Sequence, residues 1–370
     1  MIKKIFVLFS LAVLSSSLLF AKPLAVIPKQ EKTIEIVFVI DTTGSMGGLI
    51  EGAKTKVWSI INDVMQNQRS AAKVKVGLVA YRDRGDEYVT QVTPLSENLD
   101  QIYTTLMGFK AQGGGDTPED VRMALRDALA QGGWSKPEKN ISQIIFLVGD
   151  APSHRDYKDV PDVITTTKAA KAKGIIVNTI QCGSIKGTAD EWRTIAQYGG
   201  GEYFAIAQTG GVVTINTPYD QELVRLNTQL GKMYVPVGNA AKRQTALSGF
   251  VAQESKIKAA PAEAQAARAV NKSMNAYAYS SDDLIQGVEN KTIDLKKLKN
   301  EELPTNMQSM TDAQKEAYVQ ELIAERTTLK NKIKDLAKQR DEYIVKQKRE
   351  SGSQDSFDSA VSRALLKQVK

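Results

Sequence analysis

The stretch Ile36–Met46, which reads IVFVIDTTGSM, decides the fold of this chain. Its first five residues are all apolar, and the run ends abruptly in Asp41 and a turn that carries hydroxyl side chains. A short β-branched run bounded by a polar turn is typical of a strand that is buried on both faces of a parallel sheet. A helical pattern of apolar residues follows the turn. The stretch therefore predicts a buried strand, an oxygen-rich turn and then a helix.

The same alternation of strand and helix continues as far as about residue 238. Apolar runs predict further strands at residues 74–81, 144–148, 175–180 and 203–207, with a partner strand at 88–92. Helical patterns lie between them at residues 99–106, 163–172 and 191–198, and the glycine loop GGGDTPED opens another helix. Strands that alternate with helices favour right-handed crossovers and a mostly parallel sheet. Residues 33–238 are thus expected to form a doubly wound α/β domain flanked by helices.

The N-terminus has the layout of an export signal. A basic start, Met1–Lys4, precedes an apolar segment that ends near Ala21. This pattern is typical of a secretory signal peptide, and the apolar part is shorter than an ordinary membrane span of about 20 residues. We expect residues 1–21 to be a signal peptide, residues 22–32 a leader, and the protein to be periplasmic or secreted. The alternative is an uncleaved anchor, which would bring the only expected membrane contact.

The last third of the chain has a different character, without strand-like runs. Residues 239–310 predict a helical and irregular connecting region, and residues 311–350 predict one long helix. Leucine or tyrosine recurs every seven residues along that helix, but Arg326 and Arg340 occupy the alternate positions of the same stripe. This half-formed heptad pattern leaves two interpretations, packing within the chain or a coiled coil that associates with another copy. Residues 351–370 form an amphipathic tail.

Composition narrows the classes of function. The chain has 370 residues, a formal charge of +7 and 6% aromatic residues, and the basic residues are spread out rather than clustered with aromatic ones. This pattern gives no reason to expect nucleic-acid binding. The single cysteine, Cys182, excludes an internal disulfide and is read as a small buried residue. The single histidine, His154, is read as a loop residue on the rim of the site described next.

Oxygen-bearing side chains follow three of the predicted elements. Asp41, Thr43 and Ser45 alternate in the first turn, Asp116 and Thr117 follow the glycines of the glycine loop, and Asp150 ends the strand at 144–148. The carboxyl ends of parallel strands meet at one edge of a sheet, where open α/β sheets bind their ligands. Oxygen ligands without histidine or cysteine suit Mg²⁺, Mn²⁺ or Ca²⁺ better than Zn²⁺. The sequence therefore predicts a hard divalent-cation site.

These three motifs, DTTGS, then GGGDTPE, then an apolar strand that ends in GD, resemble a von Willebrand factor type A domain and its metal-ion-dependent adhesion site. The resemblance implies that the hydroxyls of Thr43 and Ser45 bind the ion and that Asp41 binds it directly or through water. It also implies a ligand from the glycine loop, either Asp116 or Thr117. Asp150 is expected to bind through water. The phrase Tyr81-Arg82-Asp83 resembles a bacterial branch of the family.

The resemblance implies binding rather than catalysis. An exposed position on the ion would accept a carboxylate from a partner, an unidentified protein with an exposed Asp or Glu. The expected function is thus a cation-dependent adhesion or scaffold module in the cell envelope, not an enzyme. One alternative is a metal-dependent phosphohydrolase, although Thr43 stands where that class has a second carboxylate. The other is a passive scaffold that self-associates through residues 311–350.

Overall fold

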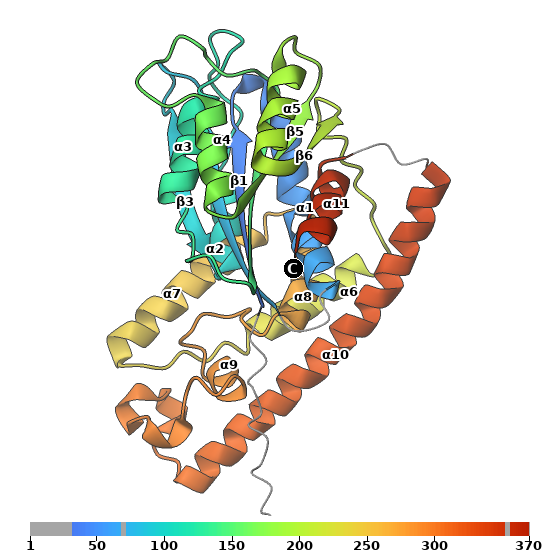
Figure 1. Ribbon diagram of the computed structural model, residues 1–370. Coiled ribbons are helices and arrows are strands. Elements are labelled where there is room, and N and C mark those ends of the chain that lie inside the picture. The colour runs from blue at the N-terminus through green and yellow to red at the C-terminus, as the bar shows by residue number, and fades with distance from the viewer. Residues whose placement is uncertain (1–31, 68–71, 352–355, 370) are drawn as a thin grey trace, which may run out of the picture. The chain divides into compact units, whose positions relative to one another are not determined.

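A six-stranded sheet lies at the centre of the computed structural model, which describes residues 32–67, 72–351 and 356–369 (Figure 1). The strand order is β3-β2-β1-β4-β5-β6, and every neighbouring pair is parallel except β2 and β3. The strands span Lys32–Asp41 (β1), Ala72–Tyr81 (β2), Thr90–Ser96 (β3), Ile141–Gly149 (β4), Ile175–Cys182 (β5) and Gly200–Ile206 (β6). The predicted doubly wound, mostly parallel α/β fold is confirmed.

Helices cover both faces of this sheet, and alternate residues of β1 face opposite layers. Ile36 and Phe38 pack with one helical layer, and Val37 and Val39 pack with the other. The first layer contains α1 (Gly47–Gln66), α2 (Leu99–Met107) and the C-terminal helix α11 (Phe357–Gln368). The second contains α3 (Val121–Gln131), α4 (Val163–Ala172) and α5 (Thr188–Gly199). Burial of β1 on both faces explains why its sequence is continuously apolar.

The antiparallel edge strand begins and ends later than the sequence indicated. The predicted strand was 88–92, but β3 spans Thr90–Ser96 and includes Pro94. Proline lacks a backbone donor and is tolerated on an edge strand, where one row of backbone groups has no strand partner. Pro94 therefore hid the end of this strand in the sequence, because a proline is acceptable in a strand only when that strand lies at the edge of the sheet.

Four helices lie between the last strand and the long helix of residues 312–351, and the described residues form one compact unit. They are α6 (Asp220–Gly231), α7 (Ala240–Ile257), α8 (Ala262–Met274) and α9 (Leu284–Glu289), followed by single 3₁₀ turns at Leu295–Lys297, Asn300–Glu302 and Thr305–Met307. Helix α8 packs against α1 and α6. A buried ion pair joins Lys56 of α1 to Glu263 of α8, and Arg268 of α8 pairs with Asp100 of α2. The boundaries expected at 238, 310 and 350 stay predictions.

The long helix α10 (Asp312–Ser351) runs along these helices and contacts α6, α8 and α9 of the same chain (Figure 1). Ile333 and Ala337 are buried in this contact. Arg326 and Arg340, the two charged residues of the heptad stripe, are buried beside them. Each forms an ion pair with a carboxylate at the start of another helix, Arg326 with Asp283, the N-cap residue of α9, and Arg340 with Asp220, the first residue of α6.

Figure 1 shows the loops that follow the parallel strands at one end of the sheet, while α7, α8 and α9 lie toward the other end. The candidate site lies among those loops, away from the added helices. Across residues 32–67, 72–351 and 356–369, no helix combines the length and the apolar character needed to cross a membrane. The expected signal peptide at residues 1–21 and nearly all of the leader lie outside the described residues.

Candidate metal centre

The first turn gathers the three oxygen side chains that its spacing predicted. Asp41 ends β1 and is fully buried, and its Oδ1 accepts hydrogen bonds from the backbone nitrogen of Thr43 at 2.8 Å and from its hydroxyl at 2.6 Å. The hydroxyls of Thr43 and Ser45 lie 3.5 Å apart. A single 3₁₀ turn, Gly44–Met46, then leads into α1. The strand thus delivers a carboxylate and two hydroxyls to one small region.

The remaining oxygen of Asp41 is buried without a well-aligned partner. No hydrogen bond of good geometry reaches Oδ2 within the described residues, although the nearby backbone N–H of Asp150 favours the charged form of this carboxylate. The buried Tyr81 hydroxyl and Glu119 Oε2 also have no such bond there. A Cβ at Gly149 would clash with that hydroxyl and lie 3.1 Å from Asp41 Oδ2, so glycine keeps the place open. Buried polar atoms without partners are uncommon and call for an explanation. A bound cation among them, with Asp41 as one of its ligands, is such an explanation.

Asp150 supplies the carboxylate that the third motif predicted. It follows β4, is almost fully buried, and its Oδ2 accepts a hydrogen bond of 2.6 Å from the side-chain amide of Gln208. Its charge acts on Asp41 and on Glu119. The carboxylates of Asp41 and Asp150 therefore lie in one electrostatic neighbourhood, as expected for two residues at the carboxyl ends of adjacent strands.

The glycine loop contributes a carboxylate that sequence reasoning missed. The loop is tied to the first turn because the Gly44 nitrogen donates to the Gly113 carbonyl at 3.1 Å. Its buried acid is Glu119, whose Oε1 would lie 3.5 Å from a Cβ placed at Gly114, beside Thr43. In the sequence Glu119 is only an acid that suits the start of a helix. No local pattern distinguishes it, because its position depends on how the loop folds back onto β1.

Asp116 and Thr117, the two ligands expected from this loop, are both exposed. Asp116 Oδ1 lies 3.6 Å from Nε2 of His154, in a group that also contains Asp83. The structure thus brings Asp116 to a neighbouring cluster, and the choice between Asp116 and Thr117 as a ligand of the first cation stays a prediction.

The electrostatics of the site favour a cation. Burial raises the pKa of Asp41 to about 7, although the hydrogen bonds from Thr43 oppose this shift. Burial also raises the pKa of Glu119 to about 9, and the charges of Asp41, Asp83, Asp86 and Asp150 add to the effect. Several carboxylates therefore share a region in which desolvation and mutual repulsion disfavour their charged forms. A divalent ion would reverse that balance and allow them to ionise.

These raised pKa values predict how the metal-free protein responds to pH. The folded state keeps protons on Asp41 and Glu119 at pH values where the unfolded chain, with ordinary values of 3.8 and 4.5, has lost them. The free energy of unfolding should therefore fall with rising pH, for Asp41 between about 4 and 7 and for Glu119 between about 4.5 and 9, by up to about 1.4 kcal/mol per pH unit for each group. Urea unfolding in EDTA measures this slope, which Asp41→Asn should make shallower. A slope that Asp41→Asn leaves unchanged would contradict the assignment.

Comparison with known proteins concerns the domain that carries these motifs. Residues 35–218 match the family model described as von Willebrand factor A domain. A curated relative, the Acanthamoeba polyphaga mimivirus protein named ariadne-like RING finger protein R811, is 28% identical over 129 residues. That alignment covers 34% of this chain, and the chain spans only 12% of the length of that relative. The findings support a von Willebrand factor A domain protein.

Three solved structures are similar to part of the chain, each over 48% of its length. The conserved hypothetical protein BatB from Bacteroides thetaiotaomicron is 17% identical, with a TM-score of 0.34 and 90% of its own chain covered. The SpRpn10 VWA domain is 14% identical, with a TM-score of 0.36 and 89% covered. An aerotolerance-related membrane protein from Bacteroides fragilis NCTC 9343 is 16% identical, with a TM-score of 0.32 and 92% covered.

Proposed function

We propose that residues 33–238 form a cation-dependent protein-binding module, in which a bound divalent ion completes its coordination with a carboxylate from a partner protein. The match of residues 35–218 to the von Willebrand factor A domain family supports this role. The observation that carries it is the buried Oδ2 of Asp41, which has no hydrogen bond of good geometry among the described residues and lies at the carboxyl edge of the sheet near other carboxylates. An ion at this edge would be reachable by a second protein.

The residues present fit such an ion. Asp41, Thr43 and Ser45 would hold it, with Asp150 in support and with the glycine loop completing the set. All of these donors are oxygens, which suits Mg²⁺ or, with a larger shell, Mn²⁺ or Ca²⁺. Magnesium prefers six ligands and keeps several waters, so one position remains for an Asp or Glu of the partner. The ion would supply a charge-assisted bond to that carboxylate.

Glu119 affects the net charge of the proposed cation site. A further carboxylate beside the ion lowers the net positive charge of the site and weakens its attraction for an acidic partner. Its pKa, raised to about 9, means that Glu119 is neutral in the metal-free fold at physiological pH. A bound divalent ion would favour the ionised form of Glu119, and this added negative charge would lower the affinity of the site for an acidic partner.

We further propose that the module works in the cell envelope after export. The pattern of residues 1–21 supports this location. The partner is accordingly sought in an envelope extract rather than in a cytoplasmic one.

Capture from an envelope extract tests the function. We compare the immobilised wild-type chain, Asp41→Asn, and Asp190→Asn as a matched control, because Asp190 is an exposed carboxylate on α5 outside the site. Each is used in Mg²⁺ and in EDTA. The account expects proteins that the wild type and Asp190→Asn retain only in Mg²⁺ and that Asp41→Asn does not retain. Capture that is equal in Mg²⁺ and EDTA, or equal for Asp41→Asn and the control, would refute cation-dependent binding.

A further inference from the structure

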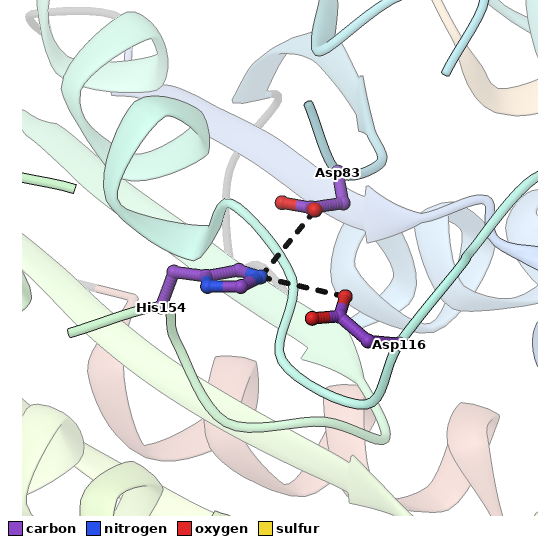
Figure 2. Close-up of side chains that lie close together, drawn as sticks. All are labelled: Asp83, Asp116 and His154. Carbon is purple, nitrogen blue, oxygen red and sulfur yellow. Dashed lines mark ion pairs between the residues drawn. The ribbon is translucent and has the colours of Figure 1, made fainter. Parts of the chain in front are cut away.

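A second cluster of metal-ligating groups lies beside the first site. Asp83 follows β2, Asp116 belongs to the glycine loop, and His154 follows β4 (Figure 2). One ligand atom from each residue lies within 4.8 Å of the others. Nε2 of His154 is 3.3 Å from Asp83 Oδ2 and 3.6 Å from Asp116 Oδ1. Three loops that are far apart in the sequence therefore direct one nitrogen and two carboxylate groups to a common point.

Contacts at Nδ1 and on the face of the ring hold the His154 imidazole in a fixed orientation. Its Nδ1 lies 2.9 Å from Asp156 Oδ1, and its ring stacks on Tyr157 with ring centroids 4.1 Å apart. Tyr157 also donates a hydrogen bond of 2.9 Å to Asp83. A carboxylate that binds the far nitrogen of a histidine is the arrangement that orients metal-bound histidines in proteins. The same contacts position Asp83, so two of the three groups are ordered without an ion.

Nε2 of His154 has no hydrogen bond in the part of the chain that the structure describes, although the residue is only 8% exposed. When the imidazole proton is on Nδ1, which faces Asp156, Nε2 carries only a lone pair, and an ionised Asp83 at 3.3 Å has no proton to donate to it. A cation between these atoms would accept electron pairs from both. Ligands of a tetrahedral zinc, with bonds of about 2.0–2.1 Å, are themselves about 3.3 Å apart.

We propose that Asp83, Asp116 and His154 form a second cation site, which takes a first-row transition-metal ion such as Zn²⁺. The imidazole nitrogen distinguishes this site from the oxygen-only set around Asp41, because nitrogen ligands favour such ions over Mg²⁺. Asp116 is largely exposed, so the ion would keep a position open to water or a partner. The site uses no residue of the Asp41 turn, and its assignment of Asp116 to the second cation leaves Thr117 and Glu119 of the same loop for the first.

A proton is the competing occupant of this cluster. Burial lowers the pKa of His154, but the hydrogen bond to Asp156 and the charges of Asp83 and Asp116 outweigh it, and the net pKa is raised. An imidazolium among carboxylates would also explain the cluster. The two occupants differ in one measurable respect, because only a metal site binds zinc with an affinity that depends on Nε2.

The test uses the full chain freed of metals with EDTA and then titrated with Zn²⁺ by calorimetry, with Co²⁺ absorption as a spectroscopic readout. We expect one zinc bound at this cluster and visible Co²⁺ bands with the wild type. His154→Ala should abolish both, and Asp156→Asn should weaken zinc binding by about 10–100-fold. Asp41→Asn should retain zinc while it loses the stabilisation by Mg²⁺, so failure of either site is distinguished from failure of the other.

Three results would overturn the second site. They are a wild-type chain that binds no zinc, a folded His154→Ala chain that binds zinc as the wild type does, and an Asp41→Asn chain that loses zinc. A cooperative thermal unfolding transition like that of the wild type, followed by circular dichroism in EDTA, shows whether His154→Ala is folded. If that variant fails to fold, Asp156→Asn replaces it, and unchanged zinc affinity in Asp156→Asn then counts against the proposal.

Discussion

Asp41→Asn should raise the unfolding temperature of the metal-free protein and abolish its stabilisation by Mg²⁺. Asparagine has the same shape, keeps an oxygen for the hydrogen bonds from Thr43, and removes a buried carboxyl whose charged form is disfavoured. The pKa of Asp41 is raised from 3.8 to about 7. At 1.36 kcal/mol per pH unit this difference corresponds to at most roughly 4 kcal/mol of gain above pH 7. The same change removes an anionic ligand of the cation.

Thermal unfolding of the wild type, Asp41→Asn and the control Asp190→Asn, each in EDTA and in Mg²⁺, measures both effects. Asp41→Asn should raise the unfolding temperature in EDTA and yet lose the rise that Mg²⁺ gives the wild type. A substitution at a residue that only supports the fold would instead lower stability in both conditions. A full Mg²⁺ response in Asp41→Asn would show that Asp41 is not a ligand.

The second large effect is expected at a buried arginine within the long helix α10. Arg326 is fully buried, and it donates hydrogen bonds of 2.7 and 3.1 Å to Asp283 and one of 2.5 Å to the Met233 carbonyl. Asp283 is also fully buried and caps α9. Removal of one partner from a buried ion pair leaves an uncompensated charge. Arg326→Met should therefore lower the free energy of unfolding by about 3–5 kcal/mol.

Urea unfolding measures this loss, with Lys338→Met as the matched control. Lys338 lies on an exposed part of α10, so the same kind of substitution should there change stability by less than about 0.5 kcal/mol. Adding Asp283→Asn to Arg326→Met should recover part of the loss, because the stranded charge is removed. A cost for Arg326→Met as small as that of the control would show that α10 does not need this pair.

The sheet was predictable because its strands carry a strong local signal. Five apolar residues before Asp41 can be buried only if both faces of the strand are covered, and the β4 sequence repeats the pattern. The role of the long helix was not predictable in the same way. Arg326 and Arg340 weaken a heptad stripe when it is read as a seam between identical helices. They fit once Asp283 and Asp220 of the same chain lie opposite them.

The side chains of the first turn could be predicted from the sequence, but the residues from other parts of the chain that join them at the site could not. Residues of one short turn share a region by chain connectivity, so the spacing of Asp41, Thr43 and Ser45 was sufficient. Glu119 and Tyr81 reach the site only through tertiary structure, one from a loop that folds back and one from the end of β2. His154 was interpreted as a rim residue because Asp83, the carboxylate that it faces, is far away in the sequence.

The most direct test of the central claim is the unfolding temperature of the wild-type chain as a function of Mg²⁺ concentration, starting from EDTA. A ligand that binds only the folded state stabilises it by an amount that grows with its concentration, about 2.7 kcal/mol at 100 times the dissociation constant. The account predicts a continuous rise in the unfolding temperature and no rise in Asp41→Asn. An unfolding temperature that stays constant in Mg²⁺, Mn²⁺ and Ca²⁺ would contradict the cation site.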